Sequence, residues 1–121
     1  MVPAKPRISV EYLDNATLVT FVDEKILEEI DIEALQSSIM VLIEQTERIN
    51  LILDFRNVQF LSSAVLGLLI RISKKIYEHD NQLRLCNISP KIYEVFKITR
   101  LNRVFDICKD AEAAVESLSA D

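Results

Sequence analysis

The residues from Leu51 to Lys75 constrain the fold of this chain more than any other stretch. The first part, Leu51–Phe55, is nearly continuous apolar sequence, which is typical of a strand covered on both faces in a parallel sheet. Asp54 and Asn57 place turn-forming side chains at the end of that strand. An apolar helical pattern begins behind Ser62, whose hydroxyl could accept a hydrogen bond from an N–H of the first turn. The stretch therefore predicts a buried strand, a short loop and a helix with Ser62 as its N-cap.

The helix that follows Ser62 has one face for the core and one for solvent. At about 100° per residue, the narrow apolar face holds Val65, Leu69, Ile72 and Ile76. The opposite side holds Ser63, Gly67, Ile70, Arg71 and Lys74. Ser63 is therefore expected to point outward at a helix N-terminus, where negative charge is favoured and a hydroxyl is well placed to carry a phosphate.

Two observations on this helix allow more than one interpretation. A Ser-Ser pair before a helix is most often only a cap, so Ser62 and Ser63 alone leave a structural and a functional interpretation open. Gly67 is the only glycine of the chain, and a glycine inside a helix costs roughly 1 kcal/mol relative to alanine. That cost is understandable if something must approach the backbone closely at this position.

The other segments alternate between strands and helices. Residues 8–12 and 18–22 are expected to pair as a hairpin across Asp14-Asn15, and a helix over 32–46 is expected to start after Asp31. Four further segments complete the series: a strand over 82–86, a helix from Ser89-Pro90 with Ile92, Val95 and Phe96 turned inward, a strand over 104–107 and a terminal helix capped by Asp110. Strands that alternate with helices require parallel crossover connections. We therefore expect one α/β domain over residues 1–121, with a mixed, mostly parallel sheet, a leading β-hairpin and four helices.

The charge of the chain argues against two classes of partner. The formal net charge is −5, whereas nucleic acids and anionic membrane surfaces are bound by basic patches. No apolar run reaches the roughly 18–20 residues that a membrane span needs. Met1–Arg7 lacks the apolar core of a signal peptide. We therefore expect a cytoplasmic protein that binds neither nucleic acid nor membrane.

Patterns typical of catalysis or metal binding are scarce. A chain with one glycine can hardly build a glycine-rich phosphate loop or a G-x-S-x-G turn. Cys86 and Cys108 form no C-x-x-C pair and are expected to be buried thiols in a reducing compartment. His79, the only histidine, follows the long helix, where a cation is favoured. We therefore expect no enzyme activity, no cofactor and no metal site.

The segment 60–67, FLSSAVLG, resembles the signature of STAS domains, specifically of bacterial anti-sigma-factor antagonists. The family pattern reads aromatic, apolar, Asp, Ser, Ser or Thr, Gly, Leu, Gly. Laid on without gaps, its phosphorylated serine falls on Ser63 and its last glycine on Gly67. The departures are Ser62 for the aspartate, Ala64 for the next Ser or Thr, and Val65 for the first glycine. The resemblance extends over residues 19–118 and implies a STAS-like fold.

This resemblance implies a function by partner switching. The unphosphorylated antagonist would bind an anti-sigma factor that is a serine kinase, the kinase would phosphorylate Ser63, and a PP2C-type phosphatase would reverse the step. The implied partner-binding residues are Ser62, Ser63, Ala64, Gly67, Leu68, Ile70, Arg71 and Asp23. Asp23 matches the family's aspartate near the phosphosite, but the acidic residues from Asp23 to Asp31 can equally be a solvated surface run.

Two other functions fit the same residues. The fold could serve as a non-switching scaffold or as a subunit of a larger signalling assembly. The loss of the family's aspartate at Ser62 favours that function, which predicts no phosphate on Ser63 in cells. A sensor of a small ligand or nucleotide is the third function, since the ends of parallel strands can form a pocket, although no residue identifies a ligand.

Overall fold

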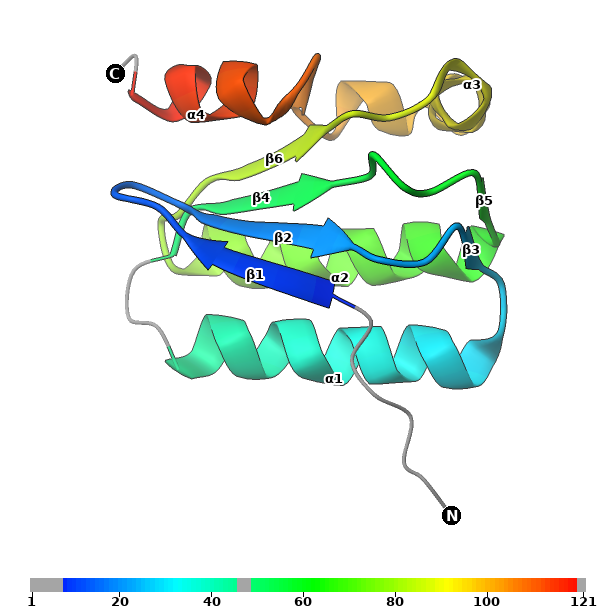
Figure 1. Ribbon diagram of the computed structural model, residues 1–121, viewed down its shortest axis with the longest axis horizontal. Helices are drawn as coiled ribbons and strands as arrows, with labels where there is room; N and C mark the ends of the chain where they lie inside the picture. The colour runs from blue at the N-terminus through cyan, green and yellow to red at the C-terminus, as the bar shows by residue number, and fades with distance from the viewer. Residues whose placement is uncertain (1–7, 46–48, 120–121) are drawn as a thin grey trace.

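A five-stranded sheet with helices on both faces organises the computed structural model, which describes residues 8–45 and 49–119 (Figure 1). The strands in sheet order are β1 (Ile8–Tyr12), β2 (Thr17–Phe21), β4 (Leu51–Asp54), β6 (Leu83–Cys86) and β7 (Ile107–Cys108). The α-helices are α1 (Glu29–Gln45), α2 (Ser63–Glu78), α3 (Pro90–Ile98) and α4 (Ala111–Ser119), and Leu101–Arg103 forms a 3-10 turn. The expected fold class is confirmed over these residues. The expectations for Met1–Arg7 and for a helix end at Thr46 lie outside them.

The sheet is antiparallel at one edge and parallel elsewhere. β1 and β2 pair antiparallel, with Ile8 opposite Phe21, and Leu13 N–H donates to the Ala16 carbonyl oxygen at 2.8 Å in the connecting turn. The expected hairpin is therefore confirmed. β2, β4, β6 and β7 pair in parallel, so β2, β4 and β6 end at the same side of the sheet. The right-hand side in Figure 1 is this carboxyl edge, where α1 and α2 begin.

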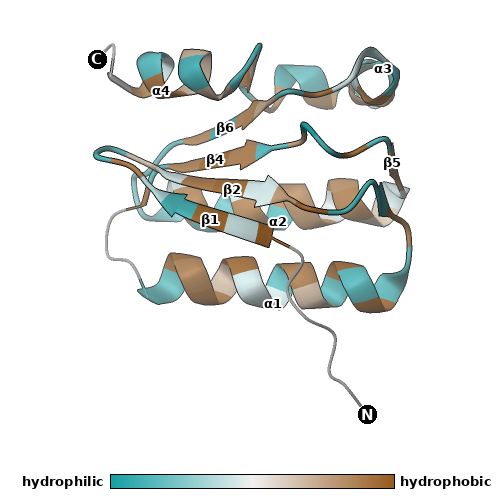
Figure 2. Cartoon of the chain, viewed as in Figure 1, coloured by the Kyte–Doolittle hydropathy of each residue, from teal (hydrophilic) through white to brown (hydrophobic). Residues whose placement is uncertain are grey.

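The two faces of the sheet are covered by different helices. α1 and α2 pack on one face and α4 on the other, and β4 is buried along its whole length. This burial is what the continuous apolar run predicts, and Figure 2 shows β4 and β6 brown over most of their length. The predicted core face of α2 is confirmed, since Val65, Leu69, Ile72 and Ile76 are all buried. None of the helices within the described ranges combines the length and apolarity that crossing a membrane requires.

Three local expectations are wrong. α1 begins at Glu29, so Asp31 lies in its first turn and does not cap it; acidic side chains in a first turn are favoured by the helix dipole. The strand expected over 104–107 is instead Ile107–Cys108, because the 3-10 turn occupies the residues before Val104. In α3, Val95 is 37% exposed because the core contact is made by Ile92 and Phe96, one helical turn apart.

A second, two-stranded sheet was not expected from the sequence. β3 (Lys25–Ile26) pairs in parallel with β5 (Phe60–Leu61). Strands of two residues are too short to produce a readable alternation of polar and apolar side chains. Their pairing brings the segment after β2 alongside the residues that lead into α2.

Candidate functional site

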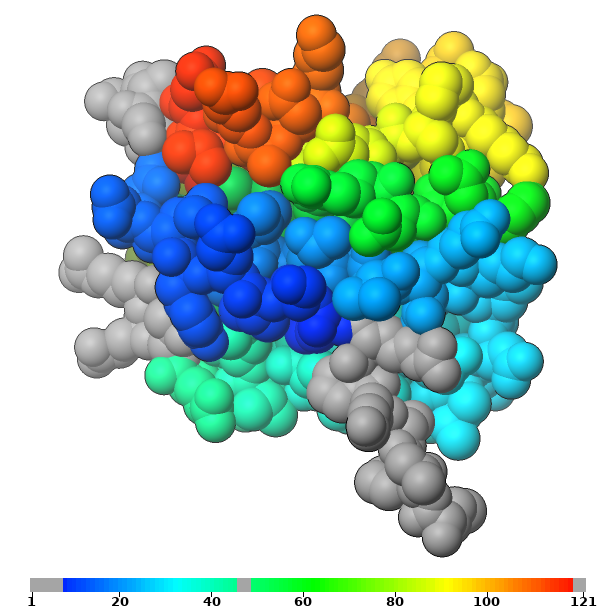
Figure 3. All heavy atoms as spheres, in the orientation of Figure 1, coloured from blue at the N-terminus to red at the C-terminus, as the bar shows by residue number. Residues whose placement is uncertain are grey.

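The start of α2 is held by main-chain hydrogen bonds from the segment that follows β2. Gln59 and Phe60 N–H groups donate to the carbonyl oxygen of Glu24 at 2.7 and 3.1 Å. Ser62 N–H donates to the carbonyl oxygen of Ile26 at 3.0 Å. Figure 3 shows the β4–β5 segment (green) at the surface between the segment after β2 (light blue) and α3 (yellow). The position of the helix start therefore does not depend on a serine side chain.

Ser62 occupies the N-cap position, but its side chain does not cap the helix. Its backbone is extended, with φ −87° and ψ 164°, as expected for an N-cap residue. A capping side chain would accept a hydrogen bond from Val65 N–H. That N–H donates instead to the Ser62 carbonyl oxygen at 3.0 Å. The Ser62 Oγ is buried and, within residues 8–45 and 49–119, is the only buried side-chain oxygen or nitrogen without a hydrogen-bond partner. The expected N-cap position is confirmed, whereas the expected side-chain bond is wrong.

The outer face of α2 carries most of the residues that sequence analysis assigned to partner binding. Ser63 is exposed in the first turn, Ala64 is exposed beside it, and Ile70 is 47% exposed further along the helix. Leu68 is a correction, because it is completely buried. It lies one turn before the core residue Ile72, so it faces the sheet and has no surface for a partner.

A shallow groove lies between α1 and α2 next to Ser63. Its lining residues are Glu29, Ile32, Glu33, Gln36 and Ser37 of α1, and Ala64, Gly67 and Arg71 of α2. Arg71 Nε and Nη2 donate to Gln36 Oε1 at 3.2 and 2.8 Å, which links the two helices. A Cβ at Gly67 would lie 3.5 Å from Arg71 Nη1, so the guanidinium lies directly over the glycine. The α1 side of the groove was not predicted from the sequence, since its polar residues form no motif.

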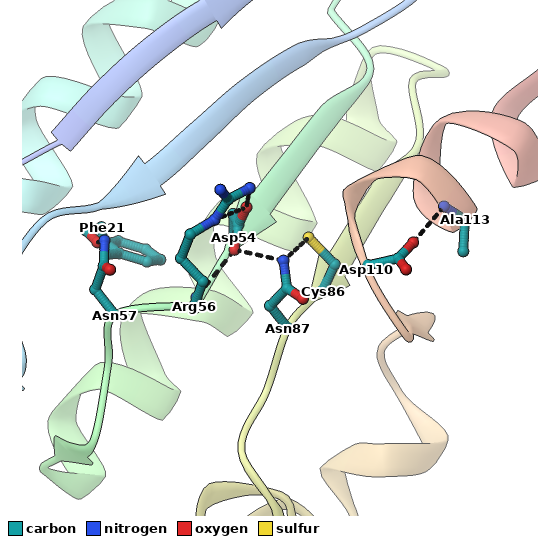
Figure 4. Close-up of polar contacts among 8 residues, drawn as sticks. All are labelled: Phe21, Asp54, Arg56, Asn57, Cys86, Asn87, Asp110 and Ala113. Carbon is teal, nitrogen blue, oxygen red and sulfur yellow. Dashed lines mark hydrogen bonds and ion pairs between the residues drawn. The ribbon is translucent and has the colours of Figure 1, made fainter.

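A buried carboxylate anchors the loop between β4 and β5 (Figure 4). Asp54 is completely buried at the end of β4. Its Oδ1 accepts hydrogen bonds from Arg56 N–H at 2.9 Å and from Asn87 Nδ2 at 3.0 Å. Its Oδ2 accepts a hydrogen bond from Arg56 Nε at 2.9 Å. The hydrogen bond to Asp54, together with its negative charge, raises the pKa of Arg56. Asn57 Nδ2 donates to the Phe21 carbonyl oxygen at 3.0 Å. These bonds tie the loop that leads to α2 to the ends of β2, β4 and β6.

An exposed aromatic ring between two cations lies just before α2. Phe60 is 39% exposed, and its ring centroid lies 3.9 Å from Lys91 Nζ and 5.6 Å from Lys25 Nζ, within the range of a cation–π interaction. Asp23 is half-buried between β2 and β3, in the segment that borders this approach to α2. The pairing of Phe60 with Lys91 was not predicted from the sequence, because α3 approaches β5 only in the folded chain.

Neither the cysteines nor the histidine line the groove between α1 and α2. Both cysteines are free; Cys86 is buried, and burial, followed by the charge of Asp54, raises its pKa to about 12. The thiol of Cys86 therefore stays protonated at neutral pH. His79 Nδ1 lies 3.0 Å from the Lys75 carbonyl oxygen at the end of α2. The described part of the chain holds no cluster of three or more His, Cys, Asp or Glu residues suited to a metal ion.

Comparison with known proteins identifies a family and named relatives. The STAS domain family model matches residues 8–114. A curated protein of Bordetella bronchiseptica, named "Putative anti-sigma factor antagonist BtrV", is 28% identical over 82 residues, which cover 68% of this chain and 70% of that protein.

Solved structures show the same fold. An anti-sigma-factor antagonist (STAS) domain protein from Planctomyces limnophilus matches with a TM-score of 0.84 at 23% identity, over 93% of this chain and 97% of that chain. The anti-sigma factor antagonist SpoIIAA in its unphosphorylated form matches with a TM-score of 0.71 at 17% identity, over 94% and 99% of the two chains. The Bacillus cell fate determinant SpoIIAA in its phosphorylated form gives 0.69 at 18% identity, over 91% and 98%.

Proposed function

The chain belongs to the STAS domain family, and from this premise we propose that it is an anti-sigma-factor antagonist that acts by partner switching. Unphosphorylated, it binds an anti-sigma factor that is a serine kinase. Phosphorylation of Ser63 by that kinase releases it, and a PP2C-type phosphatase restores the binding form. The observation that carries the proposal is the exposed hydroxyl of Ser63 on a helix start that main-chain bonds hold in place. The names of the Bordetella and Planctomyces proteins support the same role.

The switch is electrostatic. A phosphate adds about −1.5 to −2 charges in the middle of the proposed contact surface, which on α2 includes Ser63, Ala64, Gly67, Ile70 and Arg71. Such a charge must be desolvated or paired when the half-apolar surface is covered. Each 1.4 kcal/mol of lost binding energy weakens a complex about tenfold, so a loss of a few kcal/mol would dissociate a submicromolar complex.

In this role the chain is a binding module and the substrate of a kinase, and it catalyses no reaction itself. Asp23, in the segment bordering the start of α2, belongs to the proposed contact surface. Ser62 belongs to it through its position next to Ser63. Since anti-sigma factors act on transcription, the proposed location is the cytoplasm.

The proposal is tested by the binding of two variants of Ser63. Wild type, Ser63→Ala and Ser63→Glu are used to capture partners from the native lysate, and the affinity for the captured kinase is then measured by titration. We expect Ser63→Ala to bind like wild type and Ser63→Glu to bind at least tenfold more weakly. Ser9→Glu, which adds the same charge on the exposed edge strand β1, is the matched control and should bind normally. Equal binding by all four proteins would contradict the switch.

One observation favours a second function, a non-switching STAS scaffold or subunit of a signalling assembly. Ser62 stands where the family has aspartate, and its buried Oγ has no partner among the described residues. The local surroundings of Ser63 therefore lack a carboxylate that the family's phosphosite contains. Mass spectrometry of the protein isolated from its own cells separates the two functions: phosphate on Ser63 supports the switch, and an unmodified serine under every growth condition supports the scaffold.

A further inference from the structure

The guanidinium of Arg71 lies over Gly67, the only glycine of the chain. Its Nη1 lies 3.5 Å from the position of a Cβ at Gly67, one turn nearer the helix start. Long side chains on a helix point back toward its N-terminus, which explains the direction of Arg71. The guanidinium thus lies against the bare backbone of the helix, between its own Cα and Ser63.

Ser63, Gly67 and Arg71 follow one another at intervals of four residues along the same side of α2. Residues four apart on a helix have their Cβ atoms about 5–6 Å from each other. A phosphate on the Ser63 hydroxyl extends that side chain by two further bonds, and the next position on the same side of the helix, Gly67, carries no side chain to separate it from Arg71. The guanidinium over Gly67 therefore lies one helical turn from Ser63, and rotation of the two side chains toward each other would bring it to the phosphate.

We propose that Arg71 is the internal receptor for a phosphate on Ser63, and that it exchanges its present bond to Gln36 for a forked pair of bonds to the phosphate. This inference rests on the proposed function, because it requires that Ser63 is phosphorylated. It extends that function by naming the residue that holds the modified side chain. Gly67 is the residue that leaves the path between them open.

The exchange is favoured by the partners that Arg71 now has. Its Nε and Nη2 share a single neutral amide oxygen, Gln36 Oε1, and no carboxylate of the described residues forms an ion pair with it. A guanidinium binds a phosphate in a forked geometry, and such charge-assisted bonds are about twice as strong as bonds to a neutral group. The phosphate therefore competes well with the amide.

The charges around the groove direct the phosphate to this one residue. Arg71 is the only cation among the described residues that line the groove, and the α1 side carries Glu29 and Glu33. These carboxylates repel a phosphate from α1. A phosphate drawn to Arg71 and repelled by α1 would lie along α2 and over Gly67, across the surface proposed for the partner. Release of Gln36 would also remove the hydrogen bond that links α1 to α2.

The test measures the protonation of the phosphate in the full chain. Phosphoserine is introduced at position 63 by genetic encoding, and its 31P NMR signal is titrated with pH in wild type, Arg71→Gln and Lys74→Gln. The second pKa of a free phosphoserine is about 6, and pairing with a cation lowers it. We expect the pKa in the Arg71→Gln protein to be about 0.5 unit or more above that of wild type, a change of about threefold in proton affinity. Lys74→Gln, which removes an exposed cation of the same helix outside the groove, should change it much less.

A second readout follows the present partner of Arg71. The side-chain amide signals of Gln36 should shift on phosphorylation in wild type and stay unchanged in Arg71→Gln. Equal phosphate pKa values in wild type and Arg71→Gln, or an equal effect of Lys74→Gln, would overturn the inference. Both readouts use the isolated protein, so they separate this inference from the proposed function. If Arg71→Gln raises the phosphate pKa as expected but phosphorylation of Ser63 leaves partner binding unchanged, the switch alone is refuted. If phosphorylation weakens partner binding but Arg71→Gln leaves the phosphate pKa unchanged, the role of Arg71 alone is refuted.

Discussion

The starts of α2 and α3 look alike in sequence and differ in how they are held. Both follow a strand that pairs in parallel with its neighbour, β5 before α2 and β6 before α3, and both have a serine with extended backbone at the N-cap, Ser62 and Ser89. Ser89 Oγ accepts from Ile92 N–H at 3.3 Å, and Pro90 fills the first helical position. Ser62 Oγ accepts nothing, and the strand pair β3–β5 holds its helix start instead. One start is fixed by its own side chain, and the other by a neighbouring segment.

This difference shows how a helix start can be held in place while its serine hydroxyls stay available for modification. At α3 the serine hydroxyl is part of the structure, so modifying it would remove the cap. At α2 the main chain supplies the bonds that a cap would supply, so the hydroxyls of Ser62 and Ser63 are not needed for stability. A phosphate can then be added to and removed from Ser63 without unfolding the helix, which is what a reversible switch requires.

The two helix starts share one anchor, the carboxylate of Asp54, and its removal should have the largest effect. Asp54 bonds Arg56 in the loop before α2 and Asn87 in the loop before α3. Breaking a buried ion pair typically costs 3–5 kcal/mol, and we expect Asp54→Ala to lower the free energy of unfolding by about 3 kcal/mol, because the half-exposed Arg56 can be rehydrated. Urea denaturation measures this loss.

Asp54→Asn is the matched variant for this prediction. Its amide oxygen can still accept from Arg56 N–H and Asn87 Nδ2, so it should lose less than Asp54→Ala. Hydrogen exchange would show whether both helix starts loosen together. Loosening of the α2 start alone would contradict the shared anchor.

The region between β4 and α2 was predictable because its signals are local. The continuous apolar run of 51–55 encodes burial on two faces, and the helical wheel of α2 encodes which side faces the sheet. The positions of Ser62 and Ser63 follow from these two patterns. Asp110 likewise caps α4 as predicted, with its Oδ1 accepting from Ala113 N–H at 2.8 Å.

The features that were not predictable depend on contacts between distant segments. The unused hydroxyl of Ser62 follows from the pairing of β3 with β5, and a two-residue strand leaves no pattern in a sequence. The bond between Arg71 and Gln36 joins residues 35 positions apart, and nothing local marks either one. Leu68 was misassigned because the apolar side of α2 is wider than the narrow stripe used to define it.

Alkaline pH should lower the free energy of unfolding through Cys86, which ends β6, the strand that leads into α3. Burial and the charge of Asp54 raise the pKa of Cys86 from an ordinary value of 9.0 to about 12. Between these values the unfolded chain loses the thiol proton and the folded chain keeps it, so the stabilisation is full below pH 9 and decreases as pH rises toward 12. We expect wild type to lose about 1.4 kcal/mol per pH unit in this range relative to Cys86→Ala. Urea denaturation at pH 8 to 11 under reducing conditions measures the free energy of unfolding of both proteins. The same dependence on pH in wild type and Cys86→Ala would contradict the raised pKa of Cys86.

Removing the cap of α3 should have a smaller, measurable cost. Ser89→Ala leaves Ile92 N–H without its acceptor, and the loss of an N-cap side chain costs about 1 kcal/mol. Urea denaturation is the measurement. Ser89→Asp is the matched control, because its carboxylate can accept the same bond and should retain most of the stability. An unchanged stability of Ser89→Ala would mean that the cap of α3 is as dispensable as that of α2.

The equivalent substitution at α2 should have the smallest effect. Ser62→Ala removes a hydroxyl that makes no hydrogen bond, while Val65 N–H keeps its bond to the carbonyl oxygen of residue 62. A buried polar group without a partner is unfavourable, so its removal should leave the free energy of unfolding within about 0.5 kcal/mol of wild type or raise it slightly. The decisive measurement is the difference between Ser62→Ala and Ser89→Ala under the same conditions. If Ser62→Ala also costs about 1 kcal/mol, the Ser62 side chain caps α2 in solution, and the α2 start is then held in the same way as the α3 start.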